Sequence, residues 1–244
     1  MNLLIKTASV VFLSGATSLL AQSDAYYSSG GGSKGKKYIV SAGYGLGTSE
    51  WFSNHGSSSL FDRSGNLIPS ENGHFKASNA TNCTNLEVAA PLSFIRVGLG
   101  ISFEKDYLDE LTLTGGSYGS GGSKIIFDQS FGLEKIYAHI EVPFKMNTTK
   151  TYEISLKGSI GFYGYSGGTA HPDFFGGSEL PSTFFSGLGI LADYRITRHM
   201  FVFINPMIEY NYFKNTSDFD YSSIVHNIVN FSAIAGIRLD VSRD

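Results

Sequence analysis

The 244-residue chain is poor in the residues that build metal centres, disulfide scaffolds and nucleic-acid surfaces. Its single cysteine, Cys83, has no partner for an internal disulfide, and no histidines cluster near it in the sequence. Charged residues make up only 16% of the chain and the net charge is −3, so there is no basic stripe to contact nucleic acid. We therefore expect no metal, no cofactor and no nucleic-acid partner, and we interpret Cys83 as an incidental loop residue.

Long hydrophobic runs are missing except at the N-terminus. Residues 7–20 follow a lysine and are uncharged and mostly apolar, but this run is too short to span a bilayer permanently. Small residues come next, so the segment indicates a secretory signal peptide over residues 1–21, with cleavage as late as residue 25 as the alternative. The Gly, Ser and Lys content of residues 22–37 is typical of a flexible linker. Residues 38–244 are then expected to form one domain.

Glycine and aromatic residues are abundant, with 29 Gly, 14 Tyr and 19 Phe, and they occur in segments that alternate between apolar and polar residues. The clearest segment is 136–146, and residues 152–162 repeat its pattern after a short polar break. In the first, the apolar positions are Ile136, Ala138, Ile140, Val142, Phe144 and Met146, and the others are Tyr137, His139, Glu141, Pro143 and Lys145. A period of two over this length predicts strands that cross a bilayer, with the apolar face toward lipid and the polar face toward a lumen.

The same alternation predicts eight strands in all. The other well-defined ones cover residues 38–47, 94–104, 184–196, 200–213 and 229–241. A weaker third strand runs through Leu111 and Leu113, and residues 124–131 either extend it or belong to a loop. Residues 49–93 have a loop composition, and residues 106–109 predict a tight periplasmic turn. The expected fold is all-β: an eight-stranded antiparallel up-and-down transmembrane β-barrel with long extracellular loops, short periplasmic turns and a periplasmic N-terminus. A soluble lipocalin-like barrel, with its apolar faces turned inward, is the structural alternative.

The segment YAHIEVPFKMN carries a family likeness at Tyr137, Ile140, Glu141, Val142 and Pro143. It resembles the outer-membrane protein beta-barrel domain family of Gram-negative bacteria, the small eight-stranded OmpA-, OmpX- and opacity-porin-like barrels. The order of strands over residues 38–241 is similar too. The resemblance implies insertion into outer-membrane lipid and lipopolysaccharide by the barrel-assembly machinery. The chain departs from the family pattern at its end, where SRD stands in place of a terminal aromatic residue. Because Pro143 cannot donate to the ladder, we expect a β-bulge there.

Charged residues of both signs fall on the predicted inward faces. They are Arg96, Glu104, Glu141, Lys145, Glu153, Lys157, Asp193, Arg195, Glu209, Arg238 and Asp240. Side chains just fill the interior of an eight-stranded barrel, and unpaired buried charges are costly, so we predict a charge-paired plug. A channel for small solutes is the alternative.

Two further functions are suggested by the pattern. A rigid barrel with long loops suits extracellular binding, with Trp51, Phe52, Phe61, Phe75, Phe174 and Phe175 as the aromatic residues of the predicted loops. Small barrels that modify lipid A use a histidine with a serine or carboxylate, and His139, His226, Ser155, Ser232 and Glu141 are the candidates here. Neither histidine has a nucleophile at a motif spacing. We therefore expect a monomeric, non-enzymatic protein of the outer membrane with a structural or interaction role.

Overall fold

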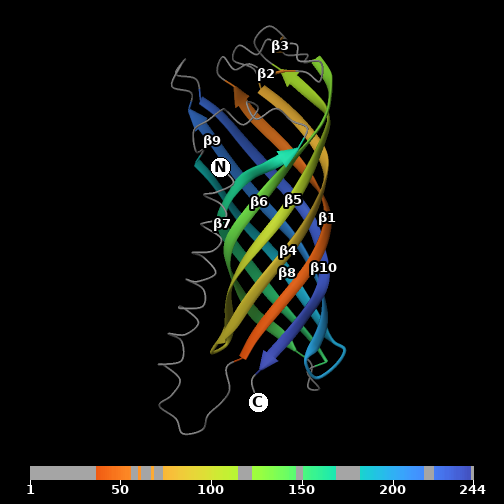
Figure 1. Ribbon diagram of the computed structural model, residues 1–244, viewed down its shortest axis with the longest axis vertical. Coiled ribbons are helices and arrows are strands. Elements are labelled where there is room, and N and C mark those ends of the chain that lie inside the picture. The colour runs from red at the N-terminus through yellow and green to blue at the C-terminus, as the bar shows by residue number, and fades with distance from the viewer. Residues whose placement is uncertain are drawn as a thin grey trace.

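The computed structural model describes residues 37–55, 60–61, 67–68, 74–114, 123–146, 151–168, 182–216 and 223–242. The expected signal peptide and all of the linker but Lys37 lie outside these residues. Eight antiparallel strands close into a barrel in the order β1-β10-β9-β8-β7-β6-β5-β4 (Figure 1). They are β1 (Lys37–His55), β4 (His74–Leu92), β5 (Ile95–Thr114), β6 (Ser123–Met146), β7 (Tyr152–Gly168), β8 (Ser182–Arg195), β9 (Met200–Thr216) and β10 (Ser223–Ser242). A separate two-stranded sheet pairs β2 (Leu60–Phe61) with β3 (Leu67–Ile68).

Alternation along each strand separates an interior from an outer face, as the sequence predicts. On β6 the odd residues from 131 to 141 are buried, while Ile140 is 41% exposed. On β10 Phe231, Ile237, Leu239 and Val241 are exposed, while Asn230 and Arg238 are buried. The exposed surface of the barrel is therefore apolar and the interior holds the polar side chains, which is the reverse of a lipocalin-like barrel.

Within the described residues, no helix has the length and apolar character needed to cross a membrane.

The predicted number of barrel strands is correct only because two errors cancel. One strand was missed, and one predicted strand does not exist. Residues 74–92, read as part of a long loop, form strand β4, which joins β1 to β5. The separate third strand does not exist, because Leu111 and Leu113 belong to the end of β5 and residues 124–131 to the start of β6. The acidic turn predicted at 106–109 lies within β5, and the Asp106 side chain is fully buried in the barrel.

The short connections and the long ones lie at opposite ends of the barrel. Residues 93–94 and 196–199 make the turns at one end, here called the short-turn end, where β6 ends and β7 begins and where β1 begins and β10 ends (Figure 1). Ser93 adopts a positive φ of 61° in the first of them. The other end carries the connections at 56–73, 115–122, 169–181 and 217–222. This division matches the predicted pattern of turns and loops.

The bulge expected at Pro143 is present and changes the face on which the next residues lie. Pro143 pairs with Ser155 but Lys145 pairs with Ile154, so the register shifts at Phe144. The prediction that Lys145 points into the lumen is therefore wrong: its side chain is exposed, on the side of the strand that carries the apolar residues of β7.

The contact between β7 and β8 is short. Within the described residues their register runs from the pair Tyr152 and Tyr194 to the pair Gly161 and Phe185, whereas β7 pairs with β6 as far as Gly168. Beyond Gly161, the Thr183 hydroxyl donates to the carbonyl of Tyr163 at 2.5 Å. A side chain thus supplies a link at the end of this seam.

The inside and outside assignment can be tested with adjacent cysteines on β7. Ile160 is 55% exposed and Ser159 is 8% exposed. In a Cys83→Ser background reconstituted in lipid vesicles, we expect Ile160→Cys to react with a membrane-dissolved maleimide and Ser159→Cys to stay unreacted until the barrel is unfolded. The reverse order of reactivity would show that the apolar faces point inward.

Candidate functional site

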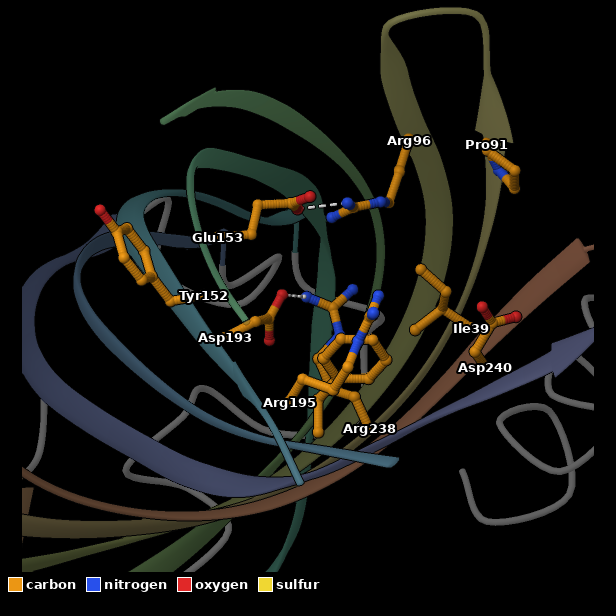
Figure 2. Close-up of a pocket in the computed structure, with 10 residues that line it drawn as sticks. Ile39, Pro91, Arg96, Tyr152, Glu153, Asp193, Arg195, Arg238 and Asp240 are labelled. Carbon is orange, nitrogen blue, oxygen red and sulfur yellow. Dashed lines mark hydrogen bonds and ion pairs between the residues drawn. The ribbon is translucent and has the colours of Figure 1, made fainter. Parts of the chain in front are cut away.

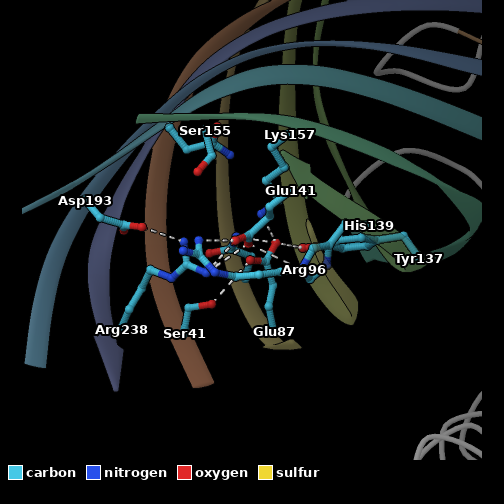
Figure 3. Close-up of polar contacts among 12 residues, drawn as sticks. Ser41, Glu87, Arg96, Tyr137, His139, Glu141, Ser155, Lys157, Asp193 and Arg238 are labelled. Atoms are coloured by element: carbon cyan, nitrogen blue, oxygen red, sulfur yellow. Dashed lines mark hydrogen bonds and ion pairs between the residues drawn. The ribbon is translucent and has the colours of Figure 1, made fainter. Parts of the chain in front are cut away.

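The interior near the short-turn end is organised around Arg238. Its guanidinium donates to both carboxylate oxygens of Glu141, at 2.9 and 2.8 Å, and to Oδ2 of Asp193 at 2.9 Å (Figure 3). Arg96 donates to Oε2 of Glu141 at 3.1 Å and also contacts Glu153. Arg238, Glu141 and Asp193 come from strands β10, β6 and β8, so these contacts tie distant parts of the wall together across the lumen.

A second group of contacts surrounds Glu87 of β4, which lies beside Glu141 in the lumen (Figure 3). Its Oε1 accepts hydrogen bonds from Lys157 Nζ at 2.5 Å and from the Tyr137 hydroxyl at 2.7 Å. Its Oε2 accepts a bond from the Ser41 hydroxyl at 3.3 Å. Glu87 therefore links β1, β6 and β7 although it lies on none of them.

The third group is centred on Lys135 of β6, which is 1% exposed. Its Nζ donates to Glu104 at 2.6 Å and to Glu209 at 2.8 Å, and Glu104 also accepts a bond from the Asn230 amide at 2.6 Å. The Lys135 ammonium lies 5.2 Å from the centre of the Phe185 ring, within cation–π range. One cation thus serves two carboxylates from opposite sides of the barrel.

Large apolar side chains fill the lumen toward the long-connection end. Trp51 and Phe131 meet edge to face with ring centres 4.6 Å apart, and neither is exposed. Leu133 and Ile228 are also buried. These residues cover the charged layers from that side.

The described residues enclose two pockets in the lumen. Near the short-turn end a cavity of about 200 Å³ is lined by both charged and apolar residues (Figure 2). These are Ile39, Pro91, Arg96, Tyr152, Glu153, Asp193, Arg195, Phe201, Arg238 and Asp240. In the middle of the lumen the space beside Glu87, Glu104 and Tyr137 is about 10 Å³, which is the size of a single water molecule. The charged layers are therefore closely packed.

The residues predicted to line the lumen have different environments in the structure. Glu104, Glu141, Lys157, Asp193 and Arg238 are buried there and make the contacts above. Arg96, Glu153 and Glu209 are partly buried and join them. Arg195 and Asp240 line the cavity, and Arg195 lies over the Phe201 ring at 5.2 Å. Only Lys145 of the predicted set is exposed on the outer side.

The predicted loop aromatics are not one group. Trp51 is fully buried in the lumen, which contradicts its assignment to an exposed loop, and Phe52, 42% exposed, lies on the outer face of β1. Phe61 belongs to β2 and Phe75 to β4 rather than to a loop. Phe174 and Phe175 lie outside the described residues. The free thiol of Cys83 is buried against Leu191, Phe203 and Ile234, so it too is not a loop residue.

Sequence reasoning missed three interior charges, Glu87, Asp106 and Lys135. The first two were placed in a loop and a turn, so their orientation was not considered. Lys135 continues the odd face of residues 137–141 by one further step, and that parity was the signal that could have found it. Both carboxylate oxygens of the buried Asp106 lack a hydrogen-bond partner among the described residues.

One cluster has the composition of a metal site. Glu87, His139 and Glu141 each offer one ligand atom, and these three atoms lie within 4.8 Å of one another. His139 is buried and neither ring nitrogen makes a hydrogen bond to the part of the chain that the structure describes, with Nε2 3.5 Å from Oε1 of Glu141. An unsatisfied buried polar group of this kind costs about 1–3 kcal/mol. The hydroxyl of Ser155, a candidate partner in the enzyme alternative, donates to Glu153 and not to His139.

The contribution of the Arg238 contacts can be measured by substitution. Arg238→Met leaves Glu141 and Asp193 buried without this cation, so we expect the free energy of unfolding to fall by about 3–5 kcal/mol. The measurement is urea unfolding in lipid vesicles, followed by the gel mobility of folded and unfolded barrel. Arg198→Met, in an exposed turn, is the matched control and should change the value by less than about 0.5 kcal/mol. Equal stability of the two variants would mean that the buried contacts do not stabilise the barrel.

Comparisons with known proteins give the fold and leave the activity open. No family model and no curated protein matches the chain. Among solved structures, the outer membrane protein OprG from Pseudomonas aeruginosa is similar over 87% of this chain and 99% of its own, with a TM-score of 0.51 and 9% sequence identity. Neisserial surface protein A covers 80% of this chain and 96% of its own, with a TM-score of 0.38 and 16% identity. The outer membrane protease OmpT from Escherichia coli covers 84% and 96%, with a TM-score of 0.36 and 8% identity. The chain therefore has the fold of a small eight-stranded outer-membrane β-barrel.

Proposed function

We propose that this protein is a monomeric, non-enzymatic barrel of the bacterial outer membrane, whose lumen is closed and whose long connections bind or protect at the cell surface. The single observation that carries the proposal is the combination of an apolar outer face with an interior filled by paired charges. A soluble barrel would gain nothing from large exposed apolar side chains around its whole circumference.

The outer face supports the membrane location in detail. Exposed aromatic residues occur close to the short-turn end, where Phe94 is 77% and Phe144 62% exposed and Tyr152 and Tyr194 are also exposed. Aromatic residues favour the interface between lipid and water, so this band suits one membrane boundary. With the signal peptide expected at residues 1–21, the short-turn end would face the periplasm and the long connections the exterior. Outer-membrane lipid, lipopolysaccharide and the barrel-assembly machinery are then the partners.

The closed lumen is supported by its packing. Charged side chains in a water-filled lumen would be exposed to solvent. Here five of them are each less than 8% exposed, namely Glu87, Glu104, Glu141, Lys135 and Arg238. An ion crossing this interior would have to break several charge-assisted hydrogen bonds between buried groups. The buried side chains of Trp51 and Phe131 fill further space toward the long-connection end. These features favour a plug over the channel alternative.

We assign surface binding to the long connections for two reasons. The lumen is closed in this proposal, and these connections are longer than the turns at the other end of the barrel. With residues 74–92 in the barrel wall, the first connection is confined to residues 56–73 and contains the short β2–β3 sheet. Rigid scaffolds commonly present binding residues on such segments.

The plug is tested by electrical recording. In planar bilayers we expect the purified protein to insert without steady single-channel steps, because the charged layers leave no continuous path. A porin of known conductance, incorporated in the same way, serves as the positive control. Steady steps that disappear in Glu141→Gln would overturn the plug and favour the channel.

The role of the first connection is tested by replacement. We expect a variant in which residues 56–73 become a short Gly-Ser linker to keep its folded gel mobility and to lose attachment of the expressing bacteria to host cells or matrix. Replacing residues 217–222 in the same way is the control for altering a connection at this end. Attachment that is unchanged by either replacement, or absent from the wild type, would remove the binding role from the first connection.

A further inference from the structure

We propose that Glu87, His139 and Glu141 form a binding site for a divalent transition-metal ion, of the zinc type, inside the barrel. The proposal is independent of whether the surface connections bind a partner. It rests on the arrangement of three strands, on the ligand capacity that the three residues keep and on the charge of their surroundings.

The three residues can meet because the strand between β4 and β6 has a glycine, Gly98, beside His139. His139 and Glu141 are two residues apart on β6, so both point into the lumen, while Glu87 lies on β4. Strand β5 separates β4 from β6, and there Gly98 pairs with His139 and Gly100 pairs with Glu87. A Cβ on Gly98 would stand 2.5 Å from both Nε2 and Cε1 of His139. The imidazole therefore occupies the space that a side chain on β5 would need, on the side toward Glu87.

Each of the three residues keeps ligand capacity after its hydrogen bonds are counted. Among the described residues, Oε2 of Glu87 accepts one bond, from Ser41, and Oε1 of Glu141 accepts one, from Arg238. A carboxylate oxygen has two lone pairs, so each can accept a further bond or ligate a metal. Neither ring nitrogen of His139 makes a hydrogen bond within the described strands, although the side chain is buried and Nε2 lies 3.5 Å from Oε1 of Glu141. Metal ligation at one nitrogen would satisfy the group that the protein otherwise leaves unsatisfied.

Charge also favours a cation at this place. The contacts that connect Glu87 and Glu141 to their neighbours join four carboxylates, Glu87, Glu141, Glu153 and Asp193. The cations in the same set are Arg96, Lys157 and Arg238. With a neutral imidazole, the set carries one negative charge in excess.

The ligand types select the class of metal. One imidazole nitrogen and two carboxylate oxygens, with a water as a fourth ligand, match the mixed tetrahedral sites that zinc occupies. Calcium takes six to eight oxygen ligands and magnesium requires an octahedron of oxygens, so three side chains including a nitrogen suit neither. The cavity of about 200 Å³ at the short-turn end is lined by Arg96, Glu153 and Arg238, which contact Glu141 or its partners, but none of the three proposed ligands lines it (Figure 2). We therefore expect the ion to enter as the barrel folds.

The test uses histidine content to isolate the site. The chain has six histidines, His55, His74, His139, His171, His199 and His226. One variant replaces all except His139 with glutamine, and its counterpart is the single substitution His139→Gln. Each full-length protein is refolded in detergent with zinc chloride present, because the site is buried, and then dialysed, and its bound zinc is measured by elemental analysis. Binding constants come from competition with a chromophoric chelator.

We expect one zinc per chain in the wild type and in the variant that keeps only His139, and at least a tenfold weaker binding in His139→Gln. X-ray absorption of the His139-only protein should show one imidazole and oxygen ligands, which no other histidine could supply. That measurement decides the question even if His139→Gln fails to fold. Absence of zinc from the His139-only protein, or unchanged zinc binding in His139→Gln, would overturn the proposal. The first result would leave a proton as the ion that balances the excess charge, and the second would place the zinc on another histidine.

Discussion

The structure depends on closure of the sheet through the pairing of its first and last strands. All 19 residues of β1 pair with β10, from Lys37 with Ser242 to His55 with Ile224. In a hydrocarbon environment an unpaired backbone group costs several kcal/mol, so an open edge could not face lipid. Closure in turn limits the lumen to a width that eight strands allow, and this width places carboxylates and cations from opposite walls in direct contact. The composition of the interior is therefore a consequence of how the backbone satisfies its hydrogen bonds.

Within this narrow space, charged residues act as connectors between strands that do not pair. Arg238 of β10 reaches Glu141 of β6, and Lys135 of β6 reaches Glu209 of β9. A buried ion pair adds little net free energy compared with apolar packing, but loss of one partner is costly. Such contacts favour one cross-section of the barrel over others. His139 stands apart, because it is buried among these groups without a hydrogen bond to any described residue, and the proposed metal site would account for it.

The faces of the strands could be predicted from the sequence, and the ends of the strands could not. Alternation is local, so it placed Glu141, Lys157 and Arg238 in the lumen without knowledge of their partners. It failed where the strands are longer than the roughly 9–11 residues that cross a bilayer. Beyond the lipid, the outer face needs no apolar residues, and Asp109 and Glu110 are exposed there on β5 with the composition of a turn. The same effect made β4 look like a loop. The contacts across the lumen depend on the relative positions of opposite strands along the barrel axis. The alternation of residues within one strand does not determine these positions.

The short register between β7 and β8 has a mechanical consequence. Within the described residues the barrel strands range from 14 residues in β8 to 24 in β6, so this part of the wall is of unequal height and is lowest at β8. A wall of hydrogen-bonded strands separates most easily where the fewest bonds must break together. We therefore expect thermal fluctuations to separate β7 from β8 first. Their backbone pairing ends at Gly161 and Phe185, and beyond it Thr183 adds a side-chain hydrogen bond. Lateral opening at that seam would expose the interior of the upper barrel and leave the ion pairs near the short-turn end intact.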